Sequence, residues 1–244
     1  MKKTFYLKYI FSLFLVECLF IFNAGCGLDV FIMLDPPHYA TNIPTTTTSY
    51  ESQYFEFYTN EIGSTQIDGT SIYYRIYNSP SLLNSDVSNL QSVANDSENS
   101  VNAPSRLIET YKYQVLRGDG VTDEPLIPYT GENKKVYIRL SDYKGIEEYS
   151  ARIMINDEDF NGVKTIPLRN LSSKATFNFG GSTTYDIKPD SDDEDVRYSS
   201  SYDNGETWYV AMFALAVGHD TTYTPIYSNI LYLGAVPIYY SDRS

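Results

Sequence analysis

The stretch WYVAMFALAV, Trp208 to Val217, is a run of ten apolar residues. A strand with one face in water alternates apolar and polar residues, whereas a strand covered on both faces is apolar throughout. A buried helix of this length is the alternative interpretation. We predict a strand at the centre of a β domain, with side chains packed on both of its faces.

The segment NILYLGAVPI, Asn229 to Ile238, follows a turn that contains Pro225, and we expect it to pair with the central strand. Earlier segments alternate apolar and polar residues, and weaker candidates follow them. These strand candidates are 54–60 (YFEFYTN), 70–77 (TSIYYRIY), 109–116 (ETYKYQVL), 134–140 (KKVYIRL), 149–155 (YSARIMI), 165–168 (TIPL) and 175–179 (ATFNF). Many short strands between turn signals predict an all-β chain, specifically an antiparallel β-sandwich of the fibronectin or immunoglobulin type.

One helix is expected within this domain. Apolar residues recur with helical spacing at Leu83, Val87, Leu90 and Ala94, and Ser79-Pro80 is a typical helix start. We predict a short helical insertion near residues 79–95, followed by a polar loop over 95–104.

The N-terminus has the pattern of a lipoprotein signal peptide. Lys2 and Lys3 precede the mostly apolar run 10–22, which is shorter than the roughly 20 residues that span a membrane. The small residues Ala24 and Gly25 then precede Cys26, whose thiol would take the lipid. An ordinary secretory peptide is the alternative. We therefore expect a signal peptide over 1–25, a lipidated tether over 26–50, where prolines and a threonine tract lack periodicity, and a single folded domain over 51–244.

Charge and cysteine content exclude several classes of function. The net charge is −13, and it becomes −15 without the signal peptide, which carries three lysines and one glutamate. Because affinity for phosphates rises with the number of cationic contacts, nucleic acid is not an expected partner. The two cysteines are Cys18, within the signal peptide, and Cys26, so lipidation of Cys26 leaves neither a catalytic thiol nor a disulfide.

A short motif precedes the central strand. Ser201, Asp203, Gly205, Thr207 and Trp208 fit S-x-D-x-G-x-T-W, which resembles the Asp box of sialidase propeller blades. The Asp-Asn-Gly turn tolerates positive φ, so the motif is expected to be a structural turn that closes a hairpin. It occurs once, the chain is too short for a six-bladed propeller, and no arginine triad is recognisable. We therefore do not expect a sialidase.

Other motifs give no catalytic chemistry. The acidic segment 190–195 could collect oxygen ligands for calcium, but it lacks the glycine and the closing helix of an EF-hand, so a solvated surface loop is the favoured interpretation. Only His38 and His219 are available for acid–base or metal chemistry, and no nucleophile elbow is present. We expect no enzyme, no cofactor and no metal site.

Two resemblances cover parts of the chain. The segments GTSIYYRIYNS (Gly69 to Ser79), WYVAMFALAVGHD and PIYSNILYLGAVPI (Pro225 to Ile238) resemble a group of spirochaete-type lipoproteins of unknown function. His219 stands where that group would have an aromatic residue. Tyr209-Val210-Ala211, Gly218 and Ser228 are similar to the last hairpin of fibronectin type III domains. These resemblances imply an envelope location and a β-sandwich, without an activity.

The sequence therefore predicts a lipid-anchored protein of the cell envelope, at the outer membrane or cell surface, that works by binding or by structure. Its membrane contact would be the N-terminal lipid, and its ligand a protein or a glycan. Tyrosine suits exposed contact surfaces. The candidate contact residues are Tyr202, Tyr223 and Tyr227. The alternative is a carbohydrate-binding or carbohydrate-active module, which needs a coplanar strip of aromatic rings.

Overall fold

Strand β12, Thr207–His219, lies between two long strands and pairs antiparallel with both: β3, Ile67–Tyr77, and β14, Leu231–Tyr239. Its side chains alternate between two hydrophobic clusters, so that Val210 and Met212 lie in one and Ala211 and Phe213 in the other. The predicted central strand, covered on both faces, is confirmed. The predicted pairing with the segment that contains β14 is confirmed as well.

The structure is a computed structural model that describes residues 33–39, 42–62, 66–122, 124–202 and 207–239. The sheet around β12 also contains four short strands: β13 pairs with β12, and the other three pair with β3. They are β4 (Gln114–Val115), β6 (Ile127–Pro128), β11 (Val196–Arg197) and β13 (Pro225–Tyr227). Among the described strands, β11 runs parallel to its partner β3, and the other pairs are antiparallel.

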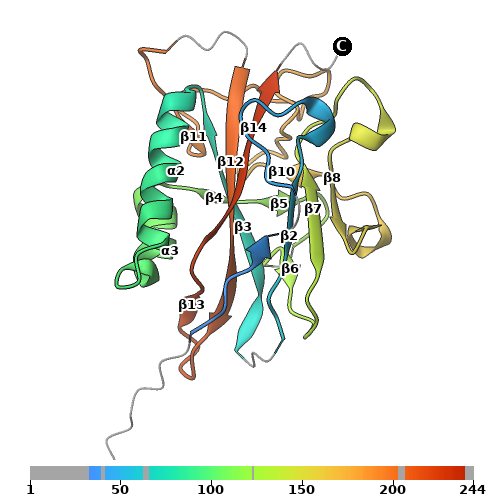
Figure 1. Ribbon diagram of the computed structural model, residues 1–244. Helices are drawn as coiled ribbons and strands as arrows, with labels where there is room; N and C mark the ends of the chain where they lie inside the picture. The colour runs from blue at the N-terminus through green and yellow to red at the C-terminus, as the bar shows by residue number, and fades with distance from the viewer. Residues whose placement is uncertain (1–32, 40–41, 63–65, 123, 203–206, 240–244) are drawn as a thin grey trace, which may run out of the picture. The chain divides into compact units, whose positions relative to one another are not determined.

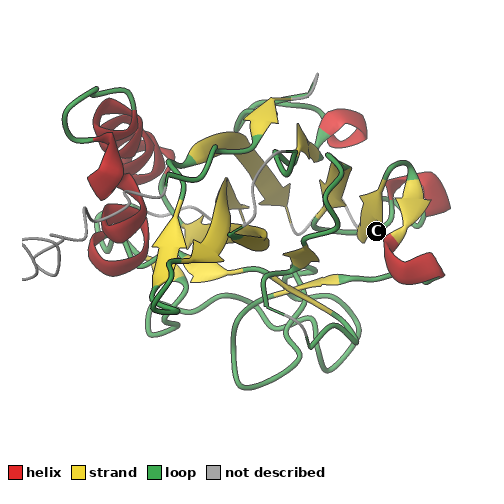
Figure 2. Ribbon diagram, turned by 90° about the horizontal axis from the view of Figure 1, so that it is seen from below, coloured by secondary structure: helices red, strands yellow, loops and turns green. Residues whose placement is uncertain are grey.

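A second sheet has five strands in the order β1-β2-β7-β8-β9, all antiparallel. They are β1 (His38–Tyr39), β2 (Phe55–Tyr58), β7 (Lys135–Arg139), β8 (Arg152–Ile155) and β9 (Glu158–Asp159). A small third sheet pairs β5, Arg117–Gly118, with β10, Pro167–Leu168. The chain is thus mostly β, with strands that curl into a half-barrel (Figure 2).

The larger hydrophobic cluster joins the first two sheets. Phe55, Phe57 and Ile138 of the smaller sheet lie in the same buried cluster as Ile76 and Val210 of the larger one. The alternation of apolar and polar residues in segments 54–60, 70–77 and 134–140 therefore marks the inner faces of β2, β3 and β7. Burial of apolar side chains stabilises the fold by roughly 1.5–3 kcal/mol for each large residue.

The second cluster lies on the other face of the larger sheet, beneath helix α2, Pro80–Ala94 (Figure 1). Ser79 is the N-cap, Pro80 occupies the first turn, and Leu83 and Leu90 are buried against the sheet. The helical insertion is confirmed, and α2 ends within the predicted bounds. Additional helical turns follow in the segment predicted as a polar loop and beyond: η2 (Ser100–Asn102), α3 (Ala103–Ser105) and the π-turn η3 (Arg106–Thr110).

The strand predicted over residues 109–116 is reduced to β4. Its first residues complete the π-turn η3, and Lys112 has a φ of 56°, which interrupts an extended chain. Tyr113 is buried with its ring edge against Phe213, at 5.3 Å between centroids. The alternation of this segment therefore reflects packing after a helical turn rather than a long strand.

The segment predicted as a tether contacts the domain in its described part. Strand β1 pairs with β2, and the carbonyl of Pro44 accepts a hydrogen bond of 2.9 Å from the Ala235 amide of β14. Residues 33–39 and 42–50 thus lie along edges of both main sheets. Edge strands offer unpaired amides and carbonyls, and this segment satisfies several of them. Short helical turns elsewhere are η1 (Tyr50–Ser52), η4 (Glu147–Tyr149) and η5 (Phe160–Gly162).

The Asp-box-like motif does not join two paired strands. Strand β12 begins at Thr207 and Trp208, as expected, but β11, the strand before it, lies on the opposite side of β3. Strands β11 and β12 are therefore separated by β3 in the sheet and do not form a hairpin with each other. Asp203 and Gly205 lie outside the described residues, and Ser201 is exposed.

Candidate functional site

The structure separates the predicted contact tyrosines into two places. Tyr202, 37% exposed, precedes the start of β12, whereas Tyr223 and Tyr227, 81% and 42% exposed, follow its end. A strand of 13 residues is about 40 Å long. Tyr202 and Tyr223 are therefore parts of different surfaces, at opposite ends of β12.

Tyr223 is held by a tight turn between β12 and β13. One carboxylate oxygen of Asp220 accepts hydrogen bonds from the Thr222 amide and hydroxyl, both at 2.7 Å, and from the Thr224 amide at 2.8 Å. These bonds, led by the one from the Thr222 hydroxyl, hold the pKa of Asp220 below its ordinary value. Tyr223 has a left-handed φ of 63°, and its ring stacks on His219, 5.1 Å between centroids. The side chain is thus fixed from behind while it projects into solvent.

His219 connects this turn to the start of β3. Its Nδ1 lies 3.0 Å from a carboxylate oxygen of Asp68, and the Asp68 carbonyl accepts a hydrogen bond of 2.9 Å from the Tyr129 amide. The turn at Tyr223, the beginning of β3 and the segment after β6 therefore lie together.

Glu61, a buried carboxylate, adds two more segments to the same place. It accepts hydrogen bonds from the Thr130 and Gly131 amides at 2.8 and 3.1 Å, and it pairs with the Lys134 ammonium at 2.5 Å. Beside it, the side-chain amide Nδ2 of Asn60 donates to the Pro36 carbonyl at 3.3 Å. We call the surface formed by residues 33–36, 60–62, 129–132 and 219–224 the loop end.

The loop end carries unusually exposed apolar side chains. Among the described residues, the three most exposed large hydrophobic side chains are Tyr223 at 81%, Met33 at 77% and Ile62 at 71%, and all three belong to this surface. Sequence reasoning identified Tyr223 and missed Met33 and Ile62. No local signal marks the latter two, since their proximity depends on the pairing of β1 with β2 and on the bond between Asn60 and Pro36.

The acidic segment has a structural role that was not predicted. Asp195 is fully buried and forms a two-pronged pair with Arg169, at 2.9 and 2.7 Å, while it also accepts a hydrogen bond of 2.6 Å from the Tyr74 hydroxyl. A second carboxylate, Asp193, bonds the same guanidinium at 2.7 Å. The expectation of a fully solvated loop is therefore wrong at its C-terminal part. Arg169, which sequence reasoning did not select, is the counter-ion that binds both carboxylates.

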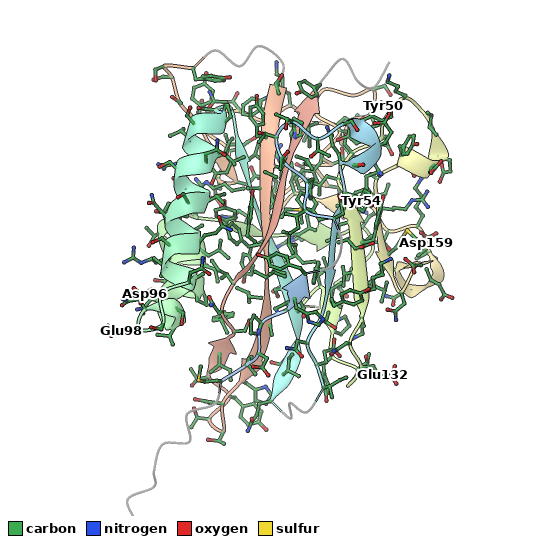
Figure 3. All side chains as sticks on the ribbon, viewed as in Figure 1. Tyr50, Tyr54, Asp96, Glu98, Glu132 and Asp159 are labelled. Atoms are coloured by element: carbon green, nitrogen blue, oxygen red, sulfur yellow. The ribbon has the colours of Figure 1, made fainter. Side chains whose placement is uncertain are left out.

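The tyrosines on the outer side of the smaller sheet stack on one another and on Arg139. The rings of Tyr54 and Tyr137 are 4.7 Å apart and nearly parallel, and the Arg139 guanidinium lies 5.5 Å from the Tyr54 ring and 5.2 Å from that of Tyr149. Figure 3 shows Tyr54 on this side of the molecule. Rings that cover each other's faces do not form the coplanar strip that stacks against a sugar.

Two cavities of about 290 and 310 Å³ open on the described surface. The first is lined by residues 115–118 and their neighbours up to Leu126. The second lies between β6, β9 and η5, where Lys134 already pairs with Glu61. Within the described part of the chain, no group of three or more histidine, cysteine, aspartate or glutamate side chains could hold a metal ion.

Cys26, the predicted lipid attachment site, lies outside the described residues. Among the helices that the structure describes, none has the length and apolar character needed to cross a membrane.

Comparisons with known proteins give no relative from which a role could be transferred. No family model matches the chain, and no curated protein or solved structure matches it either.

Proposed function

We propose that this chain is a lipid-anchored protein of the cell envelope, at the outer membrane or cell surface, that acts by binding or as a structural component. The observation that carries the proposal is the order of three features. A charged start and an apolar run precede Cys26, and the folded domain begins seven residues later at Met33. Two acyl-type chains on Cys26 would be enough for stable attachment.

We further propose that the domain is an antiparallel β-sandwich. The buried cluster shared by β2, β7, β3 and β12 supports this, because side chains from facing sheets interdigitate in a sandwich core. The immunoglobulin or fibronectin type and the kinship with spirochaete-type lipoproteins remain part of the proposal, and they rest on the resemblances in β3, β12 and β14.

The buried charges favour a non-catalytic role. Arg169 is neutralised by Asp195 and Asp193, and Glu61 is neutralised by Lys134 and by two backbone amides. Such complete pairing stabilises one arrangement and leaves little capacity to move protons. Binding through exposed tyrosines, which are frequent anchors in protein interfaces, is the more consistent activity.

Carbohydrate binding is the second candidate function. It would require ring faces that are open to a sugar, and in the described residues the pairs Tyr54–Tyr137 and His38–Tyr58 are stacked, at 4.7 and 5.4 Å. A protein ligand at the end that carries Tyr202 has no such requirement.

Metabolic labelling with a palmitate analogue tests the anchor, with Cys26→Ala as the test variant and Cys18→Ala as the matched control. We expect label in the wild type and in Cys18→Ala, and none in Cys26→Ala. Protease treatment of intact cells then reports surface exposure. An unlabelled wild type, or label that survives in Cys26→Ala, would remove the anchor from the proposal.

A further inference from the structure

We propose that the loop end is a membrane-contact surface, which lies on the zwitterionic headgroups of the bilayer that holds the lipid anchor. This inference rests on the proposed lipidation of Cys26 and adds an orientation to it. The domain would stand with Tyr223, Met33 and Ile62 toward the membrane and with Tyr202 away from it.

The chain between the lipid anchor and the domain is short. Seven residue steps separate Cys26 from Met33, and an extended chain covers about 24 Å over that number of steps. The described chain enters the domain at the loop end, where Pro36 bonds to Asn60. A short connection that joins the domain at one end holds that end near the bilayer at high effective concentration.

The exposed side chains of the loop end include large apolar groups. Exposure of large apolar side chains to water costs free energy, and the three most exposed ones among the described residues all lie at this end of the domain. Tyrosine is suited to the headgroup region, because its ring is apolar and its hydroxyl remains hydrated. Tyr223 is 81% exposed, and Asp220 and His219 hold its turn in place. Membrane contact would therefore cost the Tyr223 side chain little conformational entropy.

The charge of the loop end indicates which lipid headgroups it can contact. The exposed Glu132 (Figure 3) and Asp220 belong to the loop end, and Asp68 adjoins it through His219. The nearby Lys134 is buried and paired with Glu61. Anionic headgroups would repel these carboxylates within the Debye length of about 8 Å at physiological salt. The surface therefore fits zwitterionic lipid, and contact should weaken on an anionic membrane at low salt.

Depth-dependent quenching tests the orientation in the lipidated mature protein. Once Cys26 is lipidated and Cys18 has left with the signal peptide, an introduced cysteine is the single free thiol. Tyr223→Cys and the matched control Tyr202→Cys each receive a fluorophore. Both are exposed positions, so neither change disturbs the core. The proteins are placed on phosphatidylcholine vesicles that contain spin-labelled phosphatidylcholine.

We expect quenching that is several-fold stronger at position 223 than at 202, and a smaller difference when phosphatidylglycerol is added at low salt. Equal quenching at both positions in protein that floats with the vesicles would overturn the membrane contact and leave the anchor intact. Protection of position 223 from a water-soluble quencher in native membranes, without lipid quenching, would also overturn it and indicate a protein partner. Failure of the protein to float would refute the anchor itself, and the orientation with it.

Discussion

Arg169 and Asp195 form a two-pronged ion pair in which both side chains are completely buried, 26 residues apart in sequence. The pair joins the end of the acidic segment to β10, and the Tyr74 hydroxyl on β3 bonds to the same carboxylate. It therefore links the larger sheet to segments that have little regular structure of their own. Two buried charges at this contact are stable because each satisfies the other.

Removal of one partner should destabilise the protein strongly. Arg169→Ala leaves the fully buried Asp195 carboxylate without its counter-charge, so we expect a loss of about 3–5 kcal/mol in the free energy of unfolding. Chemical denaturation measures this loss. The matched control, Lys174→Ala, breaks the exposed pair with Asp119 and should change stability little. Similar effects of the two changes would contradict the role given to Arg169.

Gly234 should resist substitution because of the N-terminal segment. Its φ is 119°, and a Cβ atom there would lie 2.5 Å from the Pro44 carbonyl oxygen. We expect Gly234→Ala to push residues 42–48 off β14, with a loss of roughly 1–3 kcal/mol and faster amide exchange at Ala235. Gly120→Ala is the control, since Gly120 also has positive φ but has nothing within 4 Å of its Cβ position. Equal losses would show that the clash with Pro44 is unimportant.

The turn that presents Tyr223 should depend on the Asp220 side chain. Asp220→Ala removes the acceptor for three hydrogen bonds, so the amides of Thr222 and Thr224 should exchange faster with solvent. Asp220→Asn retains an acceptor oxygen and should preserve more of the protection. Unchanged exchange in Asp220→Ala would mean that backbone contacts alone hold the turn.

Buried tyrosines predict a loss of stability at alkaline pH. Burial raises the pKa of Tyr73 to about 12 and raises those of Tyr74 and Tyr77 well above the ordinary value of 10. The unfolded chain releases these protons near pH 10, so the folded state binds more protons above that pH. The contribution of these protonated tyrosines to the free energy of unfolding is fully present below pH 10 and is lost as the pH rises from 10 toward 12.

Tyrosinate absorbance, followed together with denaturant unfolding at each pH, checks this prediction. We expect a class of tyrosines that ionises only above about pH 12 or on unfolding. Ionisation of every tyrosine in one step near pH 10, at constant stability, would contradict the burial of these side chains.

The elements that were predictable share strong local periodicity. Strand β12 is apolar throughout, β2, β3 and β7 alternate, and α2 combines helical spacing with Ser79-Pro80 at its start. In each of these elements, the spacing of apolar residues within the segment itself determines which face is buried. The buried clusters between the sheets and beneath α2 follow from those faces.

The features that were missed depend on distant residues. The N-terminal segment has no periodicity, and its place is set by β2 and by Ala235 of β14. Residues 109–113 alternate like a strand, yet the π-turn η3, which ends at Thr110, and the positive φ at Lys112 determine their path. The acidic run around Asp195 indicates a solvated loop, and only the fold brings Arg169 beside this carboxylate. The loop end combines segments from four parts of the chain, so sequence reasoning found one of its three most exposed large hydrophobic side chains.

Mass spectrometry of the N-terminal peptide, taken from protein extracted from membranes, tests the proposed lipidation of Cys26. We expect a mature chain that begins at Cys26 and carries the mass of covalently attached lipid on that residue. A mature protein with an unmodified Cys26, or one cleaved at another position, would contradict the anchor and the orientation derived from it.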